Sequence, residues 1–259
     1  MRPGGFEEVY HSPMTHALTN ISADPDFLCE SCGYNLSGLP ADTNCPECGN
    51  SAAISAASLR GPSPWDRPGA GPLAFISTTS QVLFHPARFY RSLATRHGRE
   101  RSHWFGLIHM AIVSVIMGSA FYIHITWFLY LMTLYRVRDL IDAPVPGIFT
   151  YSTMVFITLI VSTRVAARLT AWEANYRGLR LPTNVVLRGL DFHAVHYLPV
   201  AIVTLATVAG WRALIHAGIL APWTNVDYLY AISGEVVLSA AYLFWTYWIG
   251  MRNMMYANA

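Results

Sequence analysis

The sequence has little charge for its length. Only 12% of its 259 residues are charged and 53% are hydrophobic, and every basic residue is an arginine. A typical soluble domain carries about 25% charged residues, so this composition excludes a disordered chain and disfavours an ordinary soluble enzyme. The net charge of +2 is too small to indicate nucleic-acid binding. The composition therefore predicts a membrane domain of several helices with one small soluble module.

Motifs of common enzymes are also missing. The sequence has no nucleophile–base pair, no phosphate-cradling glycine loop, no HExxH and no paired-carboxylate motif. We therefore expect a protein that is not an enzyme. Residues 1–27 lack the apolar core of a secretory signal peptide, and we interpret this range as a polar leader.

Cysteine is confined to one short segment. Two C-x2-C pairs are separated by twelve residues, and they comprise Cys29, Cys32, Cys45 and Cys48. Each pair places two thiolates on one tight turn, and two such turns complete a tetrahedral four-sulfur site. A glycine follows each pair and permits the positive φ that turns backbone N–H groups toward the sulfurs. The spacing predicts a zinc ribbon of short β-hairpins over 28–50, holding one structural Zn²⁺; iron of the rubredoxin type is the less favoured metal.

The role of this ribbon has two interpretations. Zinc could simply fold a module too small to own a core, or the ribbon could bind a protein partner. No arginine occurs between Arg2 and Arg60, whereas Glu30, Asp42 and Glu47 are present. This acidic character disfavours contacts with the phosphates of a nucleic acid.

The segment between the ribbon and the first apolar block divides into two parts. Residues 51–72 are small and rich in glycine and proline, and are interpreted as a flexible linker. Residues 73–103 are predicted to form an interfacial region in which Pro86 opens an amphipathic helix. One face of this helix carries apolar side chains and the other arginines: Phe89, Tyr90 and Leu93 against Arg88 and Arg91. The helix either lies on an anionic membrane surface or packs on the transmembrane bundle.

Four apolar blocks then predict an all-α polytopic membrane bundle over 104–259. The blocks are 104–135, 143–163, 192–226 and 228–251. A span needs about 20 apolar residues, so each block can cross once, and about four to five spans are expected. The first block is too long for one crossing and too short for two. We expect a helix over about 104–126, with the remainder either extending it or lying at the interface.

Arginines set the expected orientation. Five lie between residues 88 and 101, directly ahead of the first block, and the following regions along the chain contain two, five, one and one. The positive-inside rule places both termini in the cytoplasm of a bacterial cytoplasmic (inner) membrane. A reducing compartment favours a metal over disulfides at the four cysteines. The lipid bilayer is the expected partner, and the sequence predicts no oligomeric state.

Two charged residues interrupt the apolar blocks, Arg212 and Glu235. If the third span ends near residue 220 and the fourth begins near 226, their depths are about 12 and 14 Å. We therefore predict an intramembrane Arg212–Glu235 ion pair, which either fixes helix packing or serves ion or solute movement in a transporter or channel. Arg212 extending alone toward the interface is the third possibility.

Two histidines, His193 and His196, are three residues apart and share a helical face. We interpret them as interfacial side chains, with a second metal site as the alternative.

The ribbon resembles those at the front of many planctomycete membrane proteins. The resemblance rests on two stretches, Cys29–Leu39 (CESCGYNLSGL) and Cys45–Gly49 (CPECG). It implies a membrane protein with an N-terminal zinc ribbon.

Two further stretches are Leu83–Tyr90 (LFHPARFY), ahead of the first span, and His193–Pro199 (HAVHYLP), at the entry to the central spans. In these stretches the membrane part is similar to the Yip family. Members of that family usually carry about five spans and no catalytic residues, and eukaryotic members act in vesicle trafficking with small GTPases. The resemblance implies a non-catalytic, membrane-organising protein.

Overall fold

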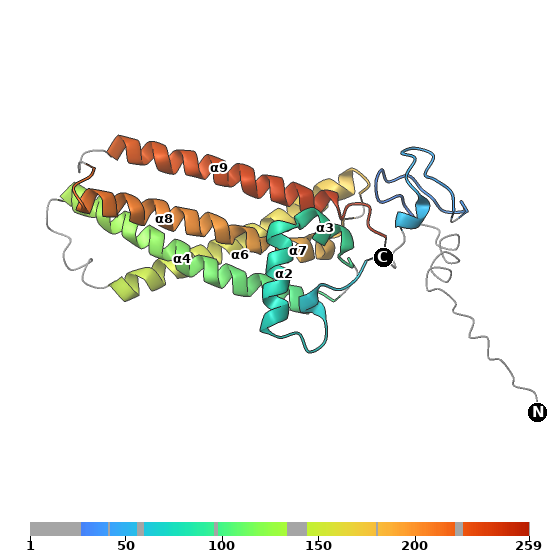
Figure 1. The fold of residues 1–259 in the computed structure, drawn as a ribbon, viewed down its shortest axis with the longest axis horizontal. Coiled ribbons are helices and arrows are strands. Elements are labelled where there is room, and N and C mark those ends of the chain that lie inside the picture. The colour runs from blue at the N-terminus through green and yellow to red at the C-terminus, as the bar shows by residue number, and fades with distance from the viewer. Residues whose placement is uncertain are drawn as a thin grey trace, which may run out of the picture.

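The computed structural model describes residues 27–40, 42–55, 60–95, 98–133, 144–179, 181–220 and 225–258. Four long helices run along a common direction, with the cysteine segment at one end (Figure 1). These helices are α4 (Glu100–Thr133), α6 (Pro144–Tyr176), α8 (Tyr197–His216) and α9 (Asn225–Arg252). Their regions contain four segments long and apolar enough to cross a membrane. The prediction of a mostly helical bundle is confirmed, and the described part of the chain has four helices that are compatible with membrane spans.

Helix α4 is the centre of the bundle. In its most apolar window 39% of the residues are buried, compared with 0% in α6, 11% in the α7–α8 region and 6% in α9. It packs against both α6 and α8. The helix continues without a break to Thr133, so the long first block forms one helix as far as the description extends. Residues 134–143 lie outside the described residues.

Small residues bring α4 and α6 close together. A Cβ added at Gly118 would lie 2.3 Å from Ser152 Oγ and 2.6 Å from Ser152 N. Near the start of α6, Gly147 faces the ring of Tyr122, 2.6 Å from the position of such a Cβ. In lipid, where burial of apolar surface no longer drives association, close packing of this kind holds helices together.

The bundle end nearest the cysteines, called the ribbon end below, is built from short helices. These are η4 (Pro64–Asp66), α2 (Pro72–Phe84), α3 (Pro86–Ser92), α7 (Thr183–His193) and η5 (Ala194–His196). Helix α2 lies across the long helices rather than along them (Figure 1). The hydrophobic core of the molecule is here and includes fully buried Tyr90, Phe105 and Phe192.

Helix α3 decides between the two alternatives for the interfacial segment. It begins at Pro86, as the sequence predicts. Its apolar side chains Phe89, Tyr90 and Leu93 are 0–4% exposed and belong to the protein core, while Arg88 and Arg91 are exposed. The apolar face therefore packs on the bundle and is not available to a membrane surface.

Part of the predicted flexible linker is a structured segment. Ser63 and Asp66 form a capping box around η4, and both side chains are buried. Trp65 donates from Nε1 to the carbonyl of Arg101 at 2.8 Å. A composition rich in small residues, glycine and proline predicts a loop. It does not reveal that residues distant in the sequence, such as Arg101, bind this segment and hold it in place. Residues 56–59 lie outside the described residues.

Candidate metal centre and its attachment to the bundle

The two cysteine pairs have matching backbones. Gly33 N donates to Cys29 O at 2.8 Å, and Gly49 N donates to Cys45 O at 2.9 Å. Both glycines have positive φ, 80° and 73°, as their position after each pair predicts. A single antiparallel bridge closes each turn, Leu28 with Asn35 and Asn44 with Ser51. The expected β-hairpins are therefore reduced to isolated bridges, and the described residues contain no named strand.

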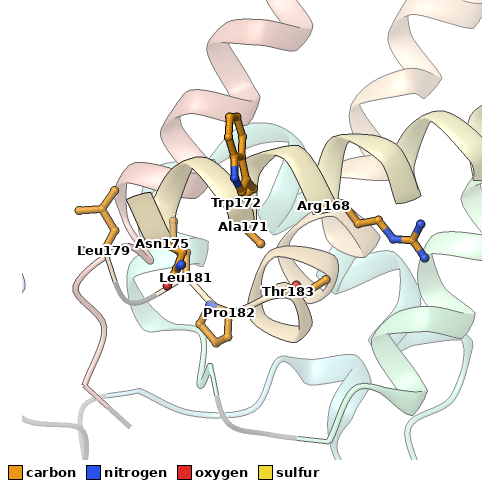
Figure 2. Close-up of a pocket in the computed structure, with 8 residues that line it drawn as sticks. All are labelled: Arg168, Ala171, Trp172, Asn175, Leu179, Leu181, Pro182 and Thr183. Carbon is orange, nitrogen blue, oxygen red and sulfur yellow. The ribbon is translucent and has the colours of Figure 1, made fainter. Parts of the chain in front are cut away.

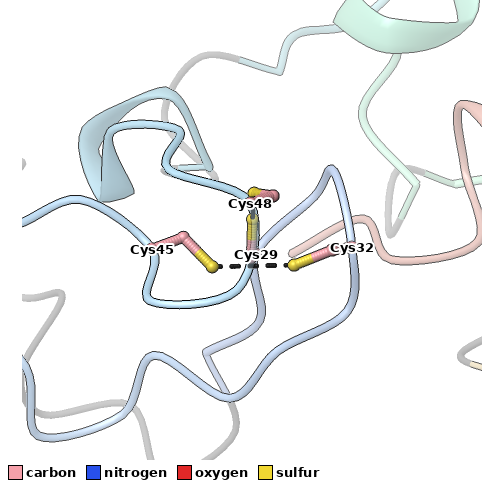
Figure 3. Close-up of side chains that lie close together, drawn as sticks. All are labelled: Cys29, Cys32, Cys45 and Cys48. Atoms are coloured by element: carbon pink, nitrogen blue, oxygen red, sulfur yellow. Dashed lines mark hydrogen bonds between the residues drawn. The ribbon is translucent and has the colours of Figure 1, made fainter.

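The four sulfurs lie within 4.8 Å of one another. Two sulfur–sulfur contacts join opposite turns, 3.6 Å for Cys29–Cys48 and 3.6 Å for Cys32–Cys45 (Figure 3). A tetrahedral zinc with Zn–S bonds of about 2.3 Å requires sulfurs about 3.8 Å apart. The sulfurs are free thiols and their spacing fits a tetrahedral ion, so these four side chains could hold one metal. They form the only such cluster among the described residues.

The thiols differ in how readily they ionise. Burial raises the pKa of the Cys29 thiol, and desolvation raises that of Cys32 to about 12. The backbone N–H of Asn50 lowers the pKa of Cys48 to about 7. Binding of a cation would require all four to become thiolates, because the thiolate is the ligand form.

The apolar core of the ribbon is very small. It consists of five buried residues, Phe27, Cys29, Leu36, Cys45 and Ala52. A module of this size cannot bury enough apolar surface to fold unaided. A metal held by the four thiols and contacts with the rest of the chain would together supply the missing stability.

Arg60 provides the first of those contacts. Its guanidinium binds Glu30 through two hydrogen bonds, Nε to Oε1 at 2.7 Å and Nη2 to Oε2 at 2.8 Å. The same group donates to the carbonyls of Tyr90, Leu93 and Asn253 at 3.0–3.2 Å. One nearly buried arginine, with 4% of its side chain exposed, thus joins the ribbon to α3 and to the end of α9.

The C-terminal segment provides the second contact. Asn258 receives a hydrogen bond from Leu28 N at 3.0 Å and donates to the carbonyls of Leu28 and Ser55 at 2.7 Å each. The ring of Tyr256 lies against Gly33, where an added Cβ would come within 2.6 Å of it. Glycine is thus needed at position 33 both for its φ and for this close approach. The segment after α9 therefore lies between the ribbon and the bundle, near the label C in Figure 1.

A second buried arginine holds the ribbon end together. Arg188 Nη2 lies 2.5 Å from Asp66 Oδ2, and the two side chains are only 2% and 0% exposed. The remaining guanidinium nitrogens donate to the carbonyls of Ala94 and Gly98 at 3.2 and 3.1 Å. The ring of Phe192 lies 5.5 Å below the guanidinium carbon. In the sequence, Arg188 is only one of the arginines that indicate topology. Its pairing with Asp66 could not be predicted because the two residues are 122 positions apart.

Asp191 forms the third ion pair at this end. It accepts from Arg99 Nε at 2.9 Å and from Nη2 at 3.3 Å, and His103 Nδ1 is 3.6 Å away. Gly106 makes room for this residue, since an added Cβ would lie 2.9 Å from the carbonyl oxygen of Asp191. These groups fasten α7 to the start of α4.

Inside the membrane-spanning bundle, Glu235 has a different partner from the expected one. Thr204 donates its hydroxyl to Glu235 Oε1. Arg212 is exposed, and the described residues contain no ion pair between Arg212 and Glu235. The helix ends explain this correction. Helix α8 ends at His216 and α9 begins at Asn225, so Arg212 is only about 6 Å from the far end whereas Glu235 is about 15 Å from it.

Helix α9 carries polar side chains at a spacing of seven residues, called the α9 polar face below. They are Tyr228, Glu235 and Tyr242, and seven residues return to nearly the same helix face. Each has a side-chain partner across the bundle: His124 Nδ1 with Tyr228 at 2.6 Å, Thr204 with Glu235, and His196 Nδ1 with Tyr242 at 2.8 Å. Consecutive contacts are about 10 Å apart along the helix.

The two neighbouring histidines are core residues. His193 and His196 are 4% and 0% exposed, so they are not interfacial as the sequence analysis expected. Their rings are 5.2 Å apart, and the described residues place no third metal-binding side chain with them. The second metal site is therefore not supported.

A surface pocket lies where α6 ends and α7 begins. It has a volume of about 480 Å³ and is lined by eight residues including Arg168, Trp172 and Thr183. Figure 2 shows the guanidinium of Arg168 and the indole of Trp172 pointing in different directions. The polar groups do not converge, so the pocket provides no site for a defined ligand.

The comparisons with known proteins add no relative to this picture: no protein-family model, curated protein or solved structure matches the chain.

Proposed function

We propose that the protein is a non-catalytic scaffold of the bacterial cytoplasmic membrane, with its zinc ribbon held rigidly at the cytoplasmic end of the bundle as a docking module for a protein partner. The attachment of the ribbon through Arg60 and Asn258 carries this proposal. A tethered ribbon would need no such contacts. A fixed one presents a surface whose position relative to the bilayer is defined.

The surface that the ribbon offers is acidic. Glu30 is neutralised by Arg60, whereas Asp42 and Glu47 are exposed, and residues 27–55 contain no arginine or lysine. Such a surface suits a protein partner with a basic patch and repels nucleic-acid phosphates.

Affinity purification from native membranes tests the proposal. The wild-type chain is compared with Asp42→Lys/Glu47→Lys, which alters the exposed surface, and with Cys45→Ser/Cys48→Ser, which removes two metal ligands. A docking role predicts that both variants insert normally but lose the same specific partners, while only the first keeps one equivalent of zinc. An unchanged set of captured proteins in both variants would contradict it.

The orientation is tested separately. A green fluorescent protein fused after Ala259 folds only in the cytoplasm, so the proposal predicts bright cells. If the fluorescent fusion is dark and a fusion of alkaline phosphatase at the same position is active, the C-terminus lies on the periplasmic side of the membrane.

A second candidate function is a small-solute or ion transporter that uses Glu235 and Arg212. The observation that favours it is the α9 polar face together with its partners. Glu235 Oε2, and Nε2 of His196, the partner of Tyr242, are buried without a hydrogen-bond partner among the described residues. The scaffold remains the better supported function because the contacts on this face are about 10 Å apart, too far for direct proton transfer between them.

Proton flux into vesicles separates the two candidates. Under the scaffold, purified protein in vesicles with an imposed pH gradient conducts no faster than protein-free vesicles. Faster flux that Glu235→Gln abolishes would establish a proton path through the polar face instead, and a parallel loss in Arg212→Ala would show that Arg212 belongs to it.

A further inference from the structure

Helix α2 presents an apolar edge that the protein does not cover. Leu73, Ile76 and Phe84 are 83%, 62% and 73% exposed. At 100° per residue these three side chains fall within about 80° of the helix circumference. The small Ser80 is the only polar residue among them. The opposite side of the helix, with Thr78 and Val82, is buried.

The exposed arc of α2 also has a polar edge. Ser77 and Gln81 are exposed, and Gln81 Nε2 donates to Ser77 Oγ at 3.2 Å. Ile76 and Gln81 lie about 140° apart around the helix. The exposed surface of the helix therefore changes from apolar at Ile76 to polar at Gln81, and Ser77 lies at the border, about 20° from Phe84.

The depth of α2 along the bundle follows from its contacts with α4. The ring of Phe75 stacks on His109, with centroids 4.7 Å apart, and packs on Phe105 at 5.0 Å. Thr79 Oγ1 lies 3.1 Å from His109 Nε2. His109 is nine residues, or about 13 Å, beyond the first residue of α4.

Helix α8 gives an independent depth marker. Its 20 residues extend about 30 Å, the thickness of the hydrocarbon core. The turn η5 comes immediately before α8 and contacts α2. Both markers place α2 at the ribbon-side boundary of the hydrocarbon, across the bundle axis as Figure 1 shows.

The charges near α2 fit that location. The helix itself contains no charged residue, and exposed arginines stand on either side of it, Arg67 before and Arg88 after. An uncharged helix flanked by arginines suits acyl chains bordered by anionic headgroups.

We propose that α2 is a membrane-interface helix whose Leu73, Ile76 and Phe84 insert among the acyl chains of the ribbon-side leaflet, while Gln81 faces the headgroups and Ser77 lies at the border between them. This contact is continuous with the lipid-facing surface of α4, where Ile108 and Ile112 are also exposed. The interfacial element of the protein is thus α2, and α3 is part of the core.

Site-specific photocrosslinking tests the proposal. Full-length protein carries p-benzoylphenylalanine in place of Ile76, Phe84, Gln81 or Ile112, one position at a time, in vesicles of phosphatidylethanolamine and phosphatidylglycerol. After irradiation, mass spectrometry counts lipid adducts. We expect yields at positions 76 and 84 within about twofold of position 112 and at least about fivefold above position 81.

The same products identify any other occupant. A crosslinked dimer at positions 76 and 84 would show that a second copy covers α2, and an adduct within the chain would show that another segment does; either overturns the proposal. Equal and low lipid yields at 76 and 81 would place α2 in water and overturn it too. Zinc content and monodispersity confirm that each labelled protein is folded.

Discussion

The ribbon end and the membrane-spanning part hold their polar groups in different ways. At the ribbon end, guanidinium groups form ion pairs and also bind several backbone carbonyls, as Arg60 and Arg188 do. Within the spans, hydroxyl groups mostly bind the carbonyl four residues earlier in their own helix; Ser114, Thr153 and Thr158 are examples. Few contacts there join side chains across helices.

The difference reflects the two solvents. A charged group at the ribbon end can be buried because it meets its counter-ion and carbonyls in one place, as in a soluble core. A polar group in the spans is better satisfied locally, since any unpaired group faces hydrocarbon. The protein thus joins a small soluble-type core to a bundle held by close packing, and the following changes should affect the two regions differently.

Removal of the metal should have the largest effect, and only on the ribbon. Apparent zinc-binding energies of about 10–16 kcal/mol fold zinc-finger peptides, and the five-residue core here cannot replace them. We expect chelation, or Cys45→Ser/Cys48→Ser, to abolish hydrogen-exchange protection over 27–55 and 253–258. Protection in α4 and α8 should stay unchanged. Loss of protection in all helices would show that the ribbon is required for the bundle itself.

The second largest effect is expected from breaking the buried Arg188–Asp66 ion pair. Arg188→Ala leaves Asp66 charged and unpaired in the core, which should lower the free energy of unfolding by about 3–5 kcal/mol. The matched control is Arg177→Ala, which removes an exposed pair with Glu173 whose side chains are 65% and 48% exposed. That change should cost less than about 0.5 kcal/mol. Thermal unfolding in detergent micelles measures both, and equal losses would contradict the importance of burial.

Close packing in the spans is tested at Gly118. Gly118→Ala places a Cβ against the backbone of Ser152, so we expect α4 and α6 to separate slightly at a cost of about 1–3 kcal/mol. Gly210→Ala is the control, because nothing lies within 4 Å of its added Cβ. That variant should be neutral or stabilised by up to about 1 kcal/mol through helix propensity. Similar stability for both variants would argue against tight α4–α6 contact.

Local patterns in the sequence were sufficient to predict the four-cysteine cluster and the long apolar helices. The spacing of Cys29, Cys32, Cys45 and Cys48 encodes both turns, because each pair closes through its own backbone hydrogen bonds. Gaps in the charge pattern located the long helices. In both cases the signal lies within a few dozen consecutive residues.

The attachments could not be predicted, because their partners are far apart in the chain. Asn258 and Leu28 are separated by 230 positions, and Arg188 and Asp66 by 122. Periodicity also cannot tell whether lipid or protein covers the apolar face of a helix. For α3 it allowed both a membrane-surface helix and a helix packed on the bundle, and the structure shows the second. The Arg212–Glu235 pair was wrong because a few residues of error at two helix ends raise the difference in depth from about 2 Å to about 9 Å.

The smallest expected effect is at Thr204, where α8 contacts α9. Thr204→Val keeps the shape but removes the hydroxyl that donates to Glu235 Oε1. Hydrogen bonds between membrane helices contribute about 0.6 kcal/mol on average, so a loss of that order in unfolding free energy is expected. A double-mutant cycle with Glu235→Gln should show coupling of similar size, whereas Arg212→Ala combined with Glu235→Gln should show none. Coupling between Arg212 and Glu235 instead would support the ion pair that the sequence predicts. Coupling to Thr204 would make Glu235 a packing contact of α8 and α9, which is what separates a scaffold from a transporter at this position.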